Sequence, residues 1–361
     1  MLAYWLIFLV PALMALQMET QRTGTVPIDE ATTPDAVWIA VGFALTLLIG
    51  FRYEVGGDWF NYFRYLDNVA GLMFDEVILE SDPGYQLFNW LSLEMDWDIF
   101  GVNLMAGATF AIGLVIFCRS LPRPWVALAV AVPYLIIVVA MGYTRQGVAL
   151  GLAMLGLVAL GKKDTGWFVF WVMLAALFHK TAVLLLPLAA LAAAHNRFVA
   201  IAWGLGALAL GYWLFLQDAA EDLYKNYVEA EYQSSGAMIR LAMNLVPAAM
   251  LFIWRRKYIF TEAERRLWLL FATISVGLFG IFLVSPSSTA VDRMALYMLP
   301  LQLVVFAHFP DVISEDSEID VSVPLLGVLA YYALVQFVWL NFADNAFAWL
   351  PYRFYPLEVW F

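Results

Sequence analysis

The amino-acid sequence predicts an all-α, polytopic integral membrane protein with about eleven to twelve membrane-spanning helices. Hydrophobic residues make up 63% of the 361 residues and charged residues only 14%, whereas soluble domains are roughly half apolar and a quarter charged. Apolar runs recur along the whole chain without a long polar gap. We therefore expect one membrane domain over residues 1–361 and no separate soluble domain.

The individual spans follow from the length rule that a spanning helix needs roughly 17 to 25 mostly apolar residues. The first candidate, Met1–Gln17, has no basic flank and is interpreted as an uncleaved helix in preference to a signal peptide. The other candidates are Val37–Phe51, Val102–Cys118, Trp125–Gly142, Gln146–Gly161, Trp167–Phe178, Thr181–Ala194, Phe198–Leu216, Ala237–Trp254, Leu267–Val284, Met294–His308 and Val323–Asn341. The two short candidates that meet at His179-Lys180 are either two tilted helices or one broken pair.

The distribution of Lys and Arg predicts the orientation, because cytoplasmic loops carry the excess. Alternating the loops places eleven basic residues inside and eight outside. The loops expected outside are Arg52–Phe100, Tyr143–Arg145, His179-Lys180, Gln217–Gly236, Ser285–Arg293 and the tail after Asn341. Residues 52–100 form the longest of them, and their segment Gln86–Met95 is too short to span and predicts an interfacial or re-entrant helix.

Six of the outer cations stand alone at or near expected helix ends: Arg52, Arg145, Lys180, Arg240, Arg293 and Arg353. One interpretation is snorkelling, in which a long side chain rests at the level of the lipid headgroups. The other is a shared anionic ligand. Six cations on the side that the orientation rule depletes of Lys and Arg favour the shared ligand.

The segment Phe51–Phe63 is the richest in polar residues. It contains Arg52, Glu54, Asp58, Asn61 and Tyr62 around a Gly-Gly pair that lets the backbone bend sharply. Carboxylates and amides bind sugar hydroxyls, and aromatic faces bind the apolar sides of the ring. The alternative is a helix exit followed by an amphipathic helix on the lipid surface.

Three further motifs carry candidate site residues: GYTRQG with Arg145 and Gln146, FHKTA with His179 and Lys180, and VDRMALY with Arg293 and Tyr297. An arginine inside an apolar span is costly and should face protein or ligand. His179 is a candidate general base, although a single His in a helix break is also a common structural hydrogen bonder. Asp292 is a candidate helix cap.

Several function classes are disfavoured. There is no Walker-type loop, no HExxH, no paired CxxC and no Rossmann fingerprint, so we expect no cofactor and no metal. The net charge of -11 with scattered basic residues argues against nucleic acid. The single cysteine, Cys118, excludes a disulfide within the chain.

In order and spacing, FRYEVGGDWFNYF, GYTRQG, FHKTA, VDRMALY and the late WLPYR resemble the EpsG family of Wzy-like exopolysaccharide polymerases. The resemblance implies a GT-C-like fold and a polymerase that joins repeat units carried on undecaprenyl diphosphate at the outer face of the bacterial inner membrane. It also places Arg52, Asp58, Arg145, His179 and Arg293 where such proteins keep characteristic polar residues. The large soluble outer loop of some relatives is small here.

The working hypothesis is an inverting, metal-independent transfer in which fixed cations stabilise the departing diphosphate. The catalytic candidates are His179, Asp58, Arg145 and Arg293, with either His179 or Asp58 as the base. The substrate-binding candidates are Arg52, Glu54, Asn61, Tyr62, Gln146, Lys180, Arg240, Tyr297 and Arg353. Expected partners are the undecaprenyl-diphosphate-linked oligosaccharide, the lipid bilayer, a chain-length regulator and export proteins.

Two alternatives stay open at this stage. A flippase or transporter for the same lipid-linked sugars would need a polar path across the membrane, yet Trp125–Gly142 and Phe198–Leu216 are almost free of polar side chains. An O-antigen ligase-like glycosyltransferase would differ only in its acceptor.

Overall fold

The chain is described by a computed structural model that covers residues 1–18, 35–188, 206, 209, 236–285, 288–315 and 318–358. Every regular element in these residues is helical, and the β-type pairing is limited there to one isolated bridge between Arg52 and Phe354. The prediction of an all-α chain is therefore confirmed for the described residues.

Five helices are long and apolar enough to cross a membrane: α7 (Asp98–Arg119), α9 (Thr144–Gly161), α14 (Ala237–Trp254), α15 (Glu262–Val284) and α18 (Ser322–Phe342). A bent pair, α16 (Ser288–Leu296) and α17 (Pro300–Ser314), makes a sixth if it counts as one span. Shorter apolar helices are α1 (Leu2–Met18), α3 (Ala36–Gly50), α8 (Pro124–Ala131) with its π-helical continuation Val132–Ala140, and α10 (Thr165–Ala176). These helices make the chain a membrane protein.

Two expected spans differ from what the structure contains. Met294–His308 is broken, with a bend of 49° between α16 and α17, because Pro300 has no N–H to continue the helix that ends at Leu296. Thr181–Ala194 begins instead as a 3-10 helix, Lys180–Leu185. Nearly all of Phe198–Leu216 and of Gln217–Gly236 lies outside the described residues, so the count of eleven or twelve spans stays a prediction.

Four helices pack in a row, with α3 against α7, α7 against α9 and α9 against α10. Glycines let α7 and α9 approach closely, since a Cβ at Gly113 would lie 2.0 Å from the Gly151 carbonyl oxygen. The helix made of α8 and its π-helical continuation is buried along its whole length. Close helix contact through small residues is a common way to pack spans in lipid.

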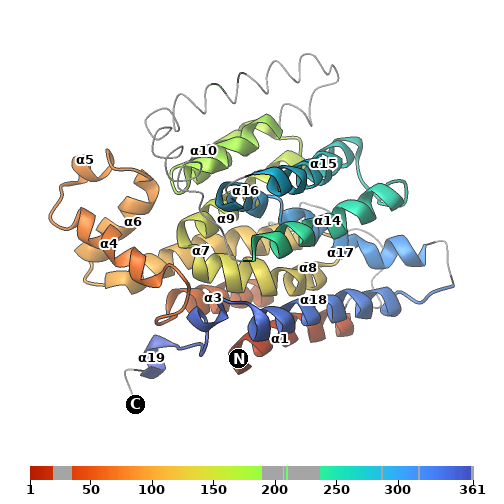
Figure 1. Cartoon of the computed structure of the whole chain (residues 1–361), viewed down its shortest axis with the longest axis horizontal. Coiled ribbons are helices and arrows are strands. Elements are labelled where there is room, and N and C mark those ends of the chain that lie inside the picture. The colour runs from red at the N-terminus through yellow and green to blue at the C-terminus, as the bar shows by residue number, and fades with distance from the viewer. Residues whose placement is uncertain are drawn as a thin grey trace.

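One end of the bundle carries the short helices. Figure 1 shows α4 (Trp59–Val69), α5 (Phe74–Val77) and α6 (Pro83–Glu94) gathered there, with α19 (Tyr355–Glu358) at the same end. Residues 52–100 thus hold three helices before α7, where the sequence predicted one. Tyr85, Gln86 and Asn89 of α6 are buried, because α6 packs against α4 and α7.

The C-terminal tail fastens this end. Trp349, which is 1% exposed, donates its indole N–H to the carbonyl of Ile137 in the π-helix at 2.8 Å. Gly56 donates its backbone N–H to Ala348 at 2.9 Å, and its φ of 110° is one that residues with a Cβ rarely adopt. The loop after α3 and the tail are therefore bound to each other and to the end of the π-helix.

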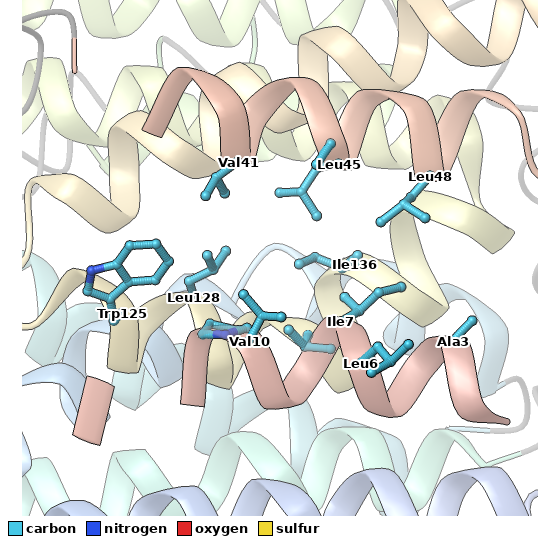
Figure 2. A pocket seen from close by; sticks show the side chains of 13 residues that line it. Ala3, Leu6, Ile7, Val10, Val41, Leu45, Leu48, Trp125, Leu128 and Ile136 are labelled. Atoms are coloured by element: carbon cyan, nitrogen blue, oxygen red, sulfur yellow. The ribbon is translucent and has the colours of Figure 1, made fainter. Parts of the chain in front are cut away.

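A cavity of about 300 Å³ lies between α1, α3 and α8. In Figure 2, Val41, Leu45 and Leu48 of α3 face Leu6, Ile7 and Val10 of α1 across it. Apolar cavities of this kind stay dry. Because its walls are hydrocarbon, this cavity offers nothing to a sugar or a phosphate, and the polar chemistry has to be sought elsewhere.

Candidate active site

Arg145 lies in the first turn of α9, where the polar motif GYTRQG meets the apolar helix. Its Nη1 forms an ion pair with the Asp82 carboxylate at 2.7 Å, and its guanidinium lies over the Tyr65 ring, 4.6 Å from the ring centroid. The side chain is 30% exposed. Arg145 therefore keeps an accessible guanidinium that one carboxylate and one aromatic face hold in place.

Arg293 is held by different partners. Its Nη1 donates to the Gln146 side-chain oxygen at 3.3 Å, and its backbone carbonyl accepts from the Gln146 amide at 2.7 Å. Its guanidinium lies 4.2 Å from the centroid of the Tyr143 ring. Gln146, a substrate-binding candidate, is itself 1% exposed and acts here as the residue that positions Arg293.

His179 lies between α10 and the 3-10 helix, outside both. Its Nδ1 is 2.6 Å from the Thr181 hydroxyl and 3.4 Å from the Tyr297 hydroxyl. Burial, together with the positive charges of Arg145 and Arg293, lowers the pKa of the imidazole to about 3. The imidazole is consequently neutral at physiological pH, as a proton acceptor must be.

These residues come from distant parts of the chain and meet at one end of the bundle. Gln146 follows Arg145 and bonds Arg293, while Tyr297 lies one helical turn after Arg293 and reaches His179. The backbone N–H of Gly84 donates to Leu177 at 3.0 Å, which brings the start of α6 against the segment before His179. We call Arg145, His179, Arg293 and Tyr297 the polar cluster.

Asp82, which precedes Pro83 at the start of α6, is a candidate site residue that the sequence analysis did not single out. Its side chain makes no capping hydrogen bond to α6. It is 7% exposed, its φ of 56° is left-handed, and it pairs with Arg145. A buried carboxylate in an uncommon backbone conformation marks a position that the surrounding structure determines.

Asp58, Asn61 and Tyr62 lie at the start of α4, beside the polar cluster. The half-buried Asp58 carboxylate accepts a long hydrogen bond of 3.4 Å from the Asn61 amide, and its charge acts on the Tyr62 and Tyr143 hydroxyls. Tyr62 is 4% exposed and packs against Tyr85. Asp58 thus has an accessible carboxylate, Asn61 lies at the exposed rim, and Tyr62 belongs to the packing beneath.

Arg52 is fully buried. It donates to the carbonyls of Val55 and Ile49 at 3.2 and 2.6 Å and to the side chains of Asn103 and Thr144 at 2.9 and 2.8 Å. Four of its five N–H donors are therefore used by neutral protein acceptors. In this arrangement Arg52 ties the loop after α3 to α7 and α9 and does not reach a ligand.

Arg240 is also bonded within the protein. It forms a two-point ion pair with Asp292, with Nε–Oδ1 at 2.6 Å and Nη2–Oδ2 at 2.7 Å, and both side chains are 3% exposed. Asp292 is not a helix cap, because α16 begins at Ser288 and Asp292 lies inside it. The pair joins α14 to α16 and so fixes the helix that carries Arg293.

Breaking this pair is expected to destabilise the fold. Replacing Asp292 by alanine leaves a buried guanidinium without its counter-charge, which costs roughly 3–5 kcal/mol of the free energy of unfolding. The double variant Asp292→Leu/Arg240→Met removes both charges and should recover most of the loss. Thermal unfolding of the detergent-solubilised chain measures both. Equal midpoints for Asp292→Ala and the unmodified chain would contradict the assignment.

The remaining candidates lie at the edge of the same end. Arg353 pairs with both Glu54 and Glu358, with side chains 34–37% exposed, and its guanidinium lies over Tyr53. Lys180 is half-buried beside Asp82, and its charge opposes the rise that burial causes in the pKa of that carboxyl group. Exposed pairs of this kind are weak, so Arg353 and Glu54 can exchange partners.

Among the described residues, no group of three or more His, Cys, Asp or Glu side chains is arranged to hold a metal ion. The positive charge of the polar cluster comes from guanidinium groups.

The chain is thus a helical membrane bundle with arginines and a neutral histidine gathered at one end. A family model describes the chain more closely: it matches the EpsG family over residues 35–354. The chain belongs to the EpsG family, a family of Wzy-like polymerases. Membership implies a membrane glycosyltransferase of exopolysaccharide biosynthesis. Searches of curated proteins and of solved structures returned no match.

Proposed function

We propose that this chain is a polysaccharide polymerase. It transfers a glycan from an undecaprenyl-diphosphate-linked donor to a hydroxyl group of a lipid-linked repeat-unit acceptor. The single observation that carries the proposal is the polar cluster, in which two accessible guanidinium groups flank a neutral imidazole. Family membership supplies the class of reaction, and the cluster supplies groups suited to its chemistry.

The two arginines of the cluster differ from the buried ones in their unused donors. Arg52 uses four of its five donors on protein acceptors and Arg240 forms a two-point pair with Asp292, whereas the Arg293 guanidinium makes one hydrogen bond, at 3.3 Å, among the described residues. Arg145 makes one ion pair there. A guanidinium offers five N–H donors in a fork that suits phosphate oxygens. Arg145 and Arg293 are therefore our candidates for binding the diphosphate, with Lys180 in support.

The reaction step that we propose is a single displacement. The acceptor hydroxyl oxygen attacks the anomeric carbon of the donor, the bond between that carbon and the diphosphate oxygen breaks, and the hydroxyl proton passes to His179. The departing diphosphate gains negative charge, which Arg145 and Arg293 stabilise more strongly in the transition state than in the ground state. One displacement inverts the anomeric configuration, and the guanidinium groups provide the charge that a metal would otherwise supply.

Thr181 and Tyr297 orient the imidazole through Nδ1, which leaves Nε2 for the acceptor proton. Asp58 is the alternative base, since its carboxylate is half-buried beside Tyr143 and is bonded only by the Asn61 amide in the described residues. Gln146, Tyr62 and Arg52 are positioning residues in this proposal. Asn61, Glu54 and Arg353 are candidates for contacts with the sugar at the rim.

We propose further that the site faces the extracytoplasmic side of the bacterial inner membrane. The supporting observation is that the loops around residues 52–58, 143–145, 179–181 and 349–355, which hold one cation each, gather at the same end of the bundle, whereas the pair Lys162-Lys163 follows the other end of α9. Cytoplasmic loops carry the basic excess. A single membrane domain, a GT-C-like arrangement, a chain-length regulator and export proteins belong to this proposal as well.

A flippase would need a polar path across the membrane. In the described spans, buried polar side chains such as Gln302 and Asn244 are bonded to one another, which favours an enzyme. Gln302 donates to Asn244 at 2.7 Å and accepts from Tyr332 at 2.7 Å, so these groups satisfy one another.

The test of the proposed function is elongation by purified protein in detergent that is given lipid-linked oligosaccharide. A polymerase makes products longer than one repeat unit, a flippase leaves the substrate unchanged, and an O-antigen ligase-like enzyme acts only when a different acceptor is added.

A further inference from the structure

A second cavity lies far from the polar cluster. Its volume is about 450 Å³, and it opens between the ends of α7 and α9, the middle of α17 and the start of α15. Leu157 and Val158 in its wall belong to the last turns of α9, whereas Arg145 lies in the first turn. Twelve residues at about 1.5 Å each put the two sites roughly 18 Å apart along that helix. The cavity is therefore separate from the proposed active site.

Three polar side chains of this cavity, His308, Glu264 and Ser120, present acceptors, while the Thr261 hydroxyl accepts the Glu264 N–H and is left to donate. His308, at 9% exposure, is bonded to the Val304 carbonyl at 2.8 Å through Nδ1, so Nδ1 must carry the proton and Nε2 of the neutral ring is an acceptor. Glu264 accepts the Thr261 backbone N–H through Oε2 at 2.8 Å, and Oε1 has no hydrogen-bond partner among the described residues. The Ser120 hydroxyl donates to the Phe117 carbonyl at 2.7 Å and is left to accept.

The rest of the wall is apolar and aromatic. Trp268 and Phe260 line the cavity together with leucine and valine side chains. A cavity that presents one carboxylate, further acceptors and aromatic rings suits a ligand with hydrogen-bond donors and positive charge, because ammonium groups bind both carboxylates and ring faces. The loops around the cavity carry Arg119, Arg255, Arg256 and Lys257, which suit a phosphate outside it.

From these groups we infer a binding site for a primary ammonium group carried on an apolar body, with Glu264 and His308 as its acceptors. An aminophospholipid such as phosphatidylethanolamine combines that ammonium with a phosphate and hydrocarbon chains. It would occupy the membrane face opposite the polar cluster. The inference does not depend on the polymerase activity, and it makes the bundle sensitive to the composition of the leaflet on that side.

The test uses the full chain in nanodiscs of phosphatidylcholine alone, or with phosphatidylethanolamine or phosphatidylglycerol added. Native mass spectrometry counts the lipid retained, and thermal unfolding gives the stabilisation. We expect one retained phosphatidylethanolamine per chain and a higher unfolding midpoint with that lipid. A separate sample in phosphatidylcholine with free ethanolamine shows whether the ammonium alone suffices. Stabilisation by free ethanolamine would assign the site to a soluble amine of the same chemistry.

Glu264→Gln is the decisive variant. Glutamine at this position can still accept the Thr261 N–H in a capping box, so the start of α15 is preserved while the charge is removed. Retention of phosphatidylethanolamine should fall at least about tenfold, as expected for the loss of a charge-assisted hydrogen bond. Glu262→Gln is the matched control, because Glu262 is 72% exposed on the same helix and pairs with Arg266. Equal retention in both variants, or preferential retention of phosphatidylglycerol, would overturn the inference.

Discussion

Replacing Arg145 or Arg293 by lysine is expected to slow chain elongation by roughly 100- to 1,000-fold, the loss seen when a donor to a developing negative charge is removed. Lysine keeps the charge but loses the planar fork that binds two phosphate oxygens together. It also loses the flat stacking on Tyr65 or Tyr143 that orients each guanidinium. The measurement is the rate of elongation of lipid-linked oligosaccharide, with polymer length read on a gel.

The kinetic pattern separates catalysis from binding. A residue that acts mainly on the departing diphosphate lowers kcat and kcat/KM together, whereas one that only holds the donor raises KM. Arg266→Lys serves as the control, since Arg266 forms an exposed pair with Glu262 on α15. Long polymer at the normal rate from both Arg145→Lys and Arg293→Lys would remove these residues from the reaction.

A further variant, Asp82→Asn, tests whether the ion pair between Asp82 and Arg145 is only structural. Asp82→Asn weakens the ion pair with Arg145 but leaves the guanidinium in place. If Arg145 binds the diphosphate, this variant changes donor affinity much less than Arg145→Lys changes the rate. If the pair is only structural, both variants reduce the unfolding midpoint and activity alike.

The sequence identified the isolated cations at the end of the bundle that holds the polar cluster. It could not show which of them are accessible and which are bonded within the protein. Six isolated cations looked equivalent, yet Arg240 is neutralised by Asp292, which lies 52 residues away. Arg52 is bonded by Thr144, 92 residues away. Such partners are fixed by how helices pack and carry no local signal. The break in Met294–His308, in contrast, does have a local signal, because Pro300 cannot continue the helix that ends at Leu296.

Asp82 is a residue whose place at a helix start the local sequence predicts, but whose charge partner it does not. Asp before Pro-Gly is typical of a helix start, and α6 does begin at Pro83. The carboxylate turns to Arg145 instead of capping the helix, which follows from α6 packing beside the segment that precedes His179. Asp82 follows Asp75, Glu76 and Glu80 in the sequence, so no local signal singles out the carboxylate that pairs with Arg145.

His179→Asn is expected to lower the rate of elongation by about 100- to 10,000-fold, the usual contribution of a general base. Asparagine can keep a bond to Thr181 but cannot accept the proton. Asp58→Asn, measured beside it, decides between the two candidate bases: the variant with the larger loss in kcat at an unchanged unfolding midpoint marks the base. Full activity of His179→Asn would leave the imidazole with a structural role.

The pH dependence provides a second readout of His179. Burial and the charges of Arg145 and Arg293 hold its pKa at about 3 in the free protein, below the ordinary value near 6.5. Between these two values the unfolded chain binds a proton that the folded chain does not, so His179 contributes a loss of stability as the pH falls from about 6.5 towards 3.

A bound diphosphate offsets the charges of the two arginines and therefore raises the pKa of His179 in the complex. Since kcat/KM reports the free enzyme and kcat the complex, the acid-side fall of kcat should lie at higher pH than that of kcat/KM. In Arg293→Lys the positive charge is kept, and this separation should persist. In Arg293→Gln, which removes the charge, the fall of kcat/KM should move to higher pH. Coincident profiles in the unmodified enzyme would mean that the diphosphate does not bind between these arginines.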